Sequence, residues 1–130
     1  MIGLDTNVVI RYLMQDEPQQ AARASAFIEQ HLSRENPGYI SLIVLVEIAW
    51  VLRSCYGIDR EKISRTFRAL LEARQIWLER ADLVVRALRR YSDTVADFSD
   101  ALIVEMARDQ GCSETVSFDR KASSLGMRML

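Results

Sequence analysis

The sequence has few of the residues that characterise zinc-stabilised or histidine-dependent proteins. Its 130 residues include two cysteines, two prolines and one histidine. Cys55 and Cys112 form no C-x-x-C pair, which argues against structural zinc, and we expect two small, buried or half-buried thiols without a disulfide. The lone histidine, His31, excludes general acid–base cleavage by a pair of histidines, and the lack of a G-x-S-x-G motif argues against a serine hydrolase triad.

Long apolar runs are also missing. The longest, from Ile40 to Leu52, is broken by Glu47 and is shorter than the roughly 20 residues that a membrane span needs. Met1 leads almost directly into a strand-like segment, without a basic region or a long apolar signal core, so we expect a cytoplasmic protein. Apolar residues make up 49% of the chain, and neither repeats nor linkers are visible, so residues 1–130 are expected to form one domain.

The net charge of −1 hides an uneven distribution of charge. Between Arg53 and Arg90 there are ten basic and five acidic residues, whereas the rest of the chain has seven basic and thirteen acidic ones. A basic middle with acidic flanks can bind a polyanion on one face and a metal ion on another. The alternative is that the arginines only line solvated helix faces.

Strand-like and helical segments alternate along the chain. The expected strands are Met1–Asp5, Tyr39–Ser41, Gln75–Glu79, Thr115–Phe118 and Met127–Leu130; the expected helices are Asn7–Met14, Pro18–Leu32, Leu42–Tyr56, Asp59–Ala73, Ala81–Tyr91 and Asp97–Gln110, with a short helix or turn at Asp119–Leu125. This order predicts an α/β protein, a three-layer α/β/α sandwich with a mainly parallel central sheet. Functional groups in such sheets gather beyond the carboxyl ends of the strands, so four polar residues are expected at one edge: Asp5, Ser41, Ser117 and Asp119.

Glu47 stands out because its neighbours on the predicted helix are all apolar. We therefore expect a buried carboxylate, which needs a cation, a metal ion or a water-filled cleft to offset its burial. The alternative is an ion pair with an arginine from another segment. The apolar neighbours are Ile43, Val44, Trp50 and Val51.

Asp5 and Asp119 each follow a predicted strand. Either could merely cap a helix, but Asp5 is followed by Thr6 and Asn7, and three consecutive good caps leave polar groups to spare. Both aspartates are therefore candidates for the functional edge of the sheet.

Asp97 and Asp100 lie one helical turn apart at a helix start. Asp97 is expected to cap this helix, with Asp100 as the acid that suits its first turn. Asp100 directly precedes an Ala-Leu-Ile run at the border of the buried face, so Asp100 is the stronger functional candidate of the two.

Four acids converging on one edge would repel one another unless a divalent cation neutralised them. Oxygen ligands without His or Cys favour Mg²⁺ or Mn²⁺ over Zn²⁺. Such an ion can activate water and stabilise charge on a scissile phosphate. The residues alone therefore point to phosphoryl chemistry and leave the substrate undetermined. The four acids are Asp5, Glu47, Asp100 and Asp119.

Four short motifs occur in the order found in PIN domains: Leu4–Asn7, the helix from Ser41 to Glu47, Asp97–Ile103 and Ser117–Asp119. Over nearly the whole chain the sequence resembles this family, and within it the VapC-like toxins of bacterial toxin–antitoxin pairs. The resemblance implies a central first strand and Mg²⁺- or Mn²⁺-dependent endoribonuclease activity on single-stranded RNA.

The resemblance also implies roles for the acids. Asp5 and Asp100 would be the main metal ligands, and Glu47 would orient or deprotonate the attacking water. Asp119 would complete the acidic pocket, and Asp97 competes with Asp100 for its place. Thr6 and Asn7 would hold Asp5 and the water network in position.

The expected partners follow from the same resemblance. They are an RNA substrate, a second copy of the chain in a homodimer, and a small VapB-like antitoxin whose tail enters the active-site groove. Candidate phosphate contacts, which could equally serve the dimer or the antitoxin, are Arg65, Arg68, Arg86, Arg89 and Arg90.

Three other readings of the sequence stay open. A receiver-like phosphoacceptor domain would need an acidic pair after the first strand, where this chain has Asp5 and then Thr-Asn, although Lys121 is roughly placed for it. A phosphatase of the haloacid-dehalogenase type would need D-x-D, and the chain has D-x-N. A non-catalytic RNA- or protein-binding module would be expected to lack one or more of the acids.

Overall fold

Every expected element is present in the computed structural model, which describes residues 1–130, with small shifts at the ends. One helix differs in kind, because its last turn, Phe27–His31, is π-helical. The elements are β1 (Ile2–Gly3), α1 (Thr6–Met14), α2 (Pro18–Ala26), η1 (Phe27–His31), β2 (Gly38–Ile40), α3 (Leu42–Ser54), α4 (Arg60–Glu72), β3 (Ile76–Leu78), α5 (Ala81–Asp93), α6 (Phe98–Asp109), β4 (Val116–Ser117), η2 (Arg120–Leu125) and β5 (Arg128–Met129).

Side-chain caps fix where several helices begin. The Asp5 carboxylate accepts a hydrogen bond from the Thr6 N–H at 2.8 Å, and the Ser41 hydroxyl accepts one from the Val44 N–H at 3.2 Å. These bonds satisfy backbone donors that the first turn of a helix leaves without partners. Both caps directly follow a strand, so α1 and α3 start at the carboxyl edge of the sheet.

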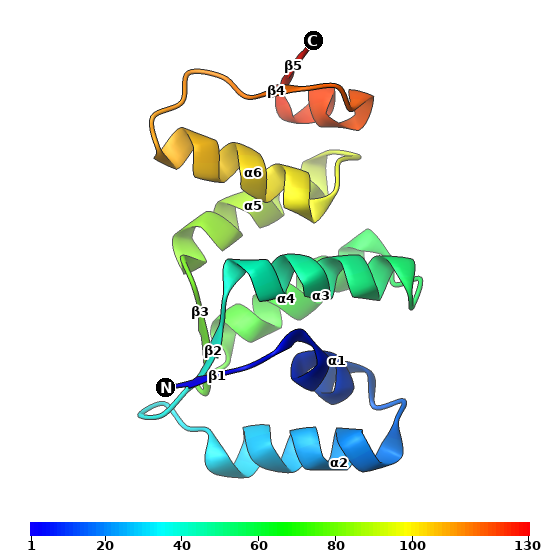
Figure 1. Ribbon diagram of the computed structural model, residues 1–130, viewed down its shortest axis with the longest axis vertical. Coiled ribbons are helices and arrows are strands. Elements are labelled where there is room, and N and C mark those ends of the chain that lie inside the picture. The colour runs from blue at the N-terminus through cyan, green and yellow to red at the C-terminus, as the bar shows by residue number, and fades with distance from the viewer.

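The strands form two separate parallel sheets. One has the order β1-β2-β3 and the other contains β4 and β5. The expected α/β/α class with parallel strands is confirmed, but β1 lies at an edge of its sheet and not at the centre. In Figure 1, β4 and β5 lie at one end of the long axis and β1 lies in the other half, with α3, α5 and α6 between them.

This arrangement corrects the expectation of one shared functional edge. Asp5 and Ser41 follow β1 and β2 in the first sheet, whereas Ser117 and Asp119 lie at the end of β4 in the second. The physical reason is that β4 hydrogen-bonds only to β5, so no backbone ladder draws the two edges together.

Three aromatic rings in the core pack α4, α5 and α6 together. Phe98, near the start of α6, packs edge-to-face on Phe67 of α4 at 5.0 Å and on Tyr91 of α5 at 6.0 Å between ring centroids. All three rings are buried. Arg60 lies over the Tyr91 ring at 4.0 Å and donates to the Thr94 carbonyl at 2.8 Å, which ties the end of α5 to α4.

Helices α5 and α6 also share a buried ion pair. Arg90 donates to the carboxylate of Glu105, whose side chain is only 8% exposed. Arg90 was one of the candidate phosphate contacts. The pair shows that this guanidinium is instead committed to holding α6 against α5.

Both cysteines are free and exposed, so the expectation of buried or half-buried thiols is wrong. Cys55 lies at the C-cap of α3 and Cys112 lies in the loop after α6, positions that no neighbouring element covers. None of the helices has the combination of length and apolar character required for a membrane crossing.

The Arg90–Glu105 pair can be tested by removing its acid. We expect Glu105→Ala to lower the free energy of unfolding by about 3 kcal/mol, because Arg90 is left partly buried without a counter-charge. Urea denaturation measures this loss. The control is Glu114→Ala, which removes an exposed pair with Arg128 and is expected to cost under about 1 kcal/mol. Equal losses for the two variants would contradict a structural role for the buried pair.

Candidate functional site

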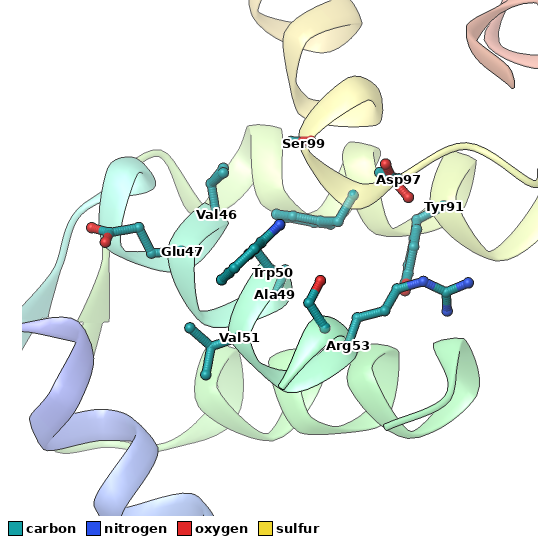
Figure 2. Close-up of a pocket in the computed structure, with 11 residues that line it drawn as sticks. Val46, Glu47, Ala49, Trp50, Val51, Arg53, Tyr91, Asp97 and Ser99 are labelled. Atoms are coloured by element: carbon teal, nitrogen blue, oxygen red, sulfur yellow. The ribbon is translucent and has the colours of Figure 1, made fainter. Parts of the chain in front are cut away.

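A groove of about 450 Å³ lies between α3 and the junction of α5 with α6 (Figure 2). It contains two of the sequence-predicted acids, Glu47 from α3 and Asp97 from the start of α6. The aromatic contact of Phe98 with α4 and α5 holds the start of α6 against this groove. Its lining residues are Val46, Glu47, Ala49, Trp50, Val51, Arg53, Ser54, Tyr91, Asp97, Phe98 and Ser99.

Glu47 is exposed, so the prediction that it is buried is wrong. Helix α3 buries a different face, and it leaves Ile43 75% and Trp50 64% exposed beside the glutamate. The arginine pairing that the sequence left open is absent too, since no ion pair involves Glu47. In Figure 2 its carboxylate points away from Asp97.

Asp97 occupies the N-cap position of α6, but its side chain makes no capping hydrogen bond. The expectation that this carboxylate caps the helix is therefore wrong. The carboxylate is exposed at the groove and forms no ion pair, so it is available to another partner.

Asp100 lies within a group of negative charges. Partial burial raises the pKa of its carboxyl, and the charges of Asp97 and Asp119 raise it further. A backbone hydrogen bond from Asp97 and the charge of Lys121 act in the opposite direction without reversing the shift. The structure therefore brings Asp97, Asp100 and Asp119 into one electrostatic cluster. Asp119 also caps η2, accepting from the Lys121 N–H at 3.0 Å.

Asp5 belongs neither to the groove nor to this cluster. It is exposed after β1, where it caps α1 through the Thr6 N–H. The Thr6 hydroxyl beside it is buried and has no hydrogen-bond partner. A buried hydroxyl without a partner costs about 1–3 kcal/mol of folding free energy. The Thr6 hydroxyl, next to Asp5, is therefore still able to form a hydrogen bond that the fold itself does not provide.

The donor chemistry of these residues fits a hard divalent cation, but their arrangement within one chain does not. Asp5, Glu47, Asp100 and Asp119 offer carboxylate oxygens and have no cationic partner in any ion pair. However, no three acidic, cysteine or histidine side chains lie close enough together to hold an ion. Within a single copy of the chain, the carboxylates that the sequence analysis expected together therefore lie in separate places.

Sequence reasoning missed two residues of the groove, Trp50 and Arg53. The apolar pattern around Glu47 predicts that Trp50 helps to bury the glutamate, yet Trp50 lies in the groove between Glu47 and Asp97 (Figure 2). For Arg53 the sequence offers no signal beyond the basic excess of the middle of the chain. Helical spacing from Glu47 could have placed Trp50 on the same face, but it could not show that this face is left open.

The shifted pKa of Asp100 makes a prediction about stability and pH. A carboxyl whose folded pKa lies above the ordinary 3.8 makes stability fall as the pH rises through that pKa, because the ionised form is disfavoured in the fold. We expect Asp100→Asn to be more stable than wild type at pH 7, with a gain that shrinks as the pH falls towards 3.8. Thermal unfolding across this range measures it. Asp93→Asn, an exposed aspartate at the end of α5, is the control, and an equal gain in both variants would contradict the cluster.

Comparisons with known proteins agree with these motifs and with this fold. The family model described as PIN domain matches residues 2–126, which include all the candidate acids. A VapC ribonuclease from Aquifex aeolicus (strain VF5) is 26% identical over 125 residues, and the match covers 96% of this chain and 92% of that protein. The chain therefore belongs to the PIN-domain family.

Proposed function

We propose that the protein is a Mg²⁺- or Mn²⁺-dependent endoribonuclease that hydrolyses phosphodiester bonds in single-stranded RNA, and that it acts as the toxin of a toxin–antitoxin pair. The observation that carries the proposal is the acidic cluster around Asp100. Burial raises the pKa of the Asp100 carboxyl and the neighbouring carboxylates of Asp97 and Asp119 raise it further, so a divalent cation placed there would neutralise repelling negative charges. The similarity to a VapC ribonuclease supports the same activity.

The proposed roles of the acids follow the family resemblance, and they need Asp5 and Asp100, which lie apart within one copy of the chain, to be brought together. Asp5 and Asp100 would hold the cation, Asp119 would complete its acidic surroundings, and Glu47 would orient or deprotonate the attacking water. When bound, the cation would supply activation of water and neutralisation of the charge that develops on the phosphate. The antitoxin partner and the cytoplasmic location belong to the same proposal and rest on the family resemblance.

The groove supports RNA as the substrate. Trp50 exposes its ring in the groove, and a base can stack on an exposed ring whatever its identity. Arg53 lines the same groove and forms no ion pair, so its guanidinium can meet a phosphate. Arg86 is placed less well, because its charge already acts on Asp82 and Asp109.

A second candidate function is a non-catalytic RNA-binding module that uses the same groove. The separation of Asp5 from Asp100 within one chain favours it. A metal-induced rise in the melting temperature would distinguish the two, because a module without catalysis has no need for a divalent cation at these acids.

The nuclease proposal is tested by cleavage of a mixed single-stranded RNA with Mg²⁺, with Mn²⁺ and with EDTA. We expect cleavage with either metal and none with EDTA, and we expect Asp100→Asn and Glu47→Gln each to lower the rate at least about 100-fold. Glu61→Gln, an exposed glutamate of α4, is the control and should keep wild-type activity. If the folded, partner-free protein cleaves no RNA with either metal, the non-catalytic module becomes the better account.

The groove is tested separately by RNA affinity. Trp50→Ala is expected to weaken binding of single-stranded RNA by roughly 10-fold, since stacking contributes about 1–3 kcal/mol per base. Arg53→Ala should reduce the slope of log affinity against log salt by about 0.7 for one lost phosphate contact. Trp77→Ala is the matched control, because Trp77 on β3 is 58% exposed outside the groove. Fluorescence titration measures all three, and equal losses for the two tryptophans would rule the groove out as the RNA site.

A further inference from the structure

The first sheet ends in an open edge along β1. The N–H groups of Ile2 and Leu4 donate to the Pro37 and Tyr39 carbonyls, each at 2.9 Å. Backbone groups of successive strand residues point to opposite sides, so Gly3 presents its N–H and C=O to the free side. A side-chain carbon added at Gly3 would meet nothing within 4 Å. This edge is therefore open to another strand.

The second sheet has an open edge of the same kind along β4. The carbonyls of Thr115 and Ser117 accept from the Arg128 and Leu130 N–H groups of β5, at 2.9 and 3.0 Å. Val116 lies between them and presents its backbone groups to the opposite, unpaired side. A two-stranded sheet is marginally stable by itself, and an open strand edge is a template for pairing. Each of the two edges, along β1 and along β4, thus lacks a neighbouring strand to accept and donate its free backbone hydrogen bonds.

The surfaces beside the two edges are complementary. A groove of about 600 Å³ runs beside β1, α1 and α2, where Val8 and Phe27 supply apolar surface. Arg23 lines this groove and forms no ion pair. At the other edge Phe118 is 82% exposed directly after β4, and the acidic Asp119 follows it. An apolar ring with a neighbouring carboxylate matches an apolar groove with a free arginine.

Within one chain the two edges are held apart. The Arg90 guanidinium, fixed by Glu105, also reaches the Leu125 carbonyl of η2 at 3.5 Å, and η2 and β5 pack together beside α6. Figure 1 shows α5, α6 and α3 between β4 and β1 along the long axis. In this arrangement β4 does not reach β1 of its own chain, because η2 packs on α6 and keeps the second sheet at that end of the molecule.

We propose that β4 of one copy pairs with the open edge of β1 of a second copy, and that each active site is completed across this interface. If β4 of each copy pairs with β1 of the other, both open edges of both copies are covered and the result is a closed two-fold dimer. In a parallel arrangement, Asp119 of one copy and Asp5 of the other follow neighbouring strands at the same carboxyl edge. The proposal rests on the proposed nuclease function only for its second half, the sharing of the site.

Sharing of the site is tested by two purified heterodimers carrying different affinity tags. The first combines an Asp5→Asn chain with an Asp100→Asn chain. In a shared site one of its two centres is fully wild type, so about half of the wild-type cleavage rate is expected. The second combines a wild-type chain with an Asp5→Asn/Asp100→Asn chain, and both of its centres carry a lesion, so no cleavage is expected. The reverse pattern, an inactive first heterodimer and a half-active second one, would show that each chain completes its own site and would overturn the inference.

Strand pairing is tested without any activity, by sedimentation of the protein in solution. The wild type is expected to be a dimer, and Val116→Lys to be a monomer of unchanged helical content, because a charge on an edge strand opposes pairing. Val116→Pro, which removes only the N–H that faces the open side, is expected to do the same. Val95→Lys, at an exposed valine outside the strands, should remain a dimer. A monomeric wild type, or a dimer that survives both Val116 substitutions, would overturn the pairing.

The two tests separate the proposals. If the wild type cleaves no RNA but Val116→Lys dissociates the dimer, the nuclease function fails and the strand pairing stands. If the wild type cleaves RNA and the heterodimers show the reverse pattern, the nuclease function stands and the shared site fails.

Discussion

The edge-to-face packing of Phe98 between Phe67 and Tyr91 is the contact on which the candidate site depends. It joins α4, α5 and α6 at one point, and α6 begins there. Asp97 immediately precedes Phe98, and Asp100 follows it by two residues, so the rings set the place of both carboxylates. Without this contact the groove between α3 and α6 would lose one wall.

The acidic side chains at the two ends of α6 differ in whether an arginine balances their charge. Near its C-terminus, Asp109 shares Arg80 with Asp82, and hydrogen bonds from that guanidinium hold the pKa of Asp82 at about 2. Near its N-terminus, Asp97 and Asp100 have no arginine, and the pKa of Asp100 is raised. Acids that serve the fold are therefore neutralised by partners from the chain itself. At the start of α6, by contrast, burial and the neighbouring carboxylates raise the pKa of a half-buried acid and no arginine pairs with it.

Local signals in the sequence predicted most of the fold. Helix caps such as Asp5 and Ser41, and the glycines that follow α3 and α6, have effects within a few residues, so the order and type of the elements could be anticipated. Of the four acids expected together, Asp100 and Asp119 influence each other's surroundings, whereas Asp5 and Glu47 lie elsewhere. Asp97, which was expected mainly to cap α6, joins the group around Asp100 because it lies one helical turn away. The family resemblance, which the comparison confirmed, supplied the expectation of nuclease activity, which spacing alone could not do.

The errors have a common physical origin in long-range packing. Periodicity showed that the surroundings of Glu47 are apolar, but whether another element covers that face depends on the placement of distant helices. The division of the strands into two sheets likewise depends on which distant segments meet, and the alternation of strands and helices along the chain does not determine it. The exposure of Cys55 and Cys112 follows the same rule, since composition cannot show which loops remain uncovered.

The open edge of β1 also has a consequence for synthesis of the chain. Val116 follows Gly3 by 113 positions, so the first edge strand leaves the ribosome long before the strand that would pair with it. At about 5–20 residues per second the interval is on the order of ten seconds. During that time the Gly3 edge is available to β4 of any completed copy nearby, whereas the chain's own β4 does not yet exist. The order of translation thus favours assembly between chains over closure within one.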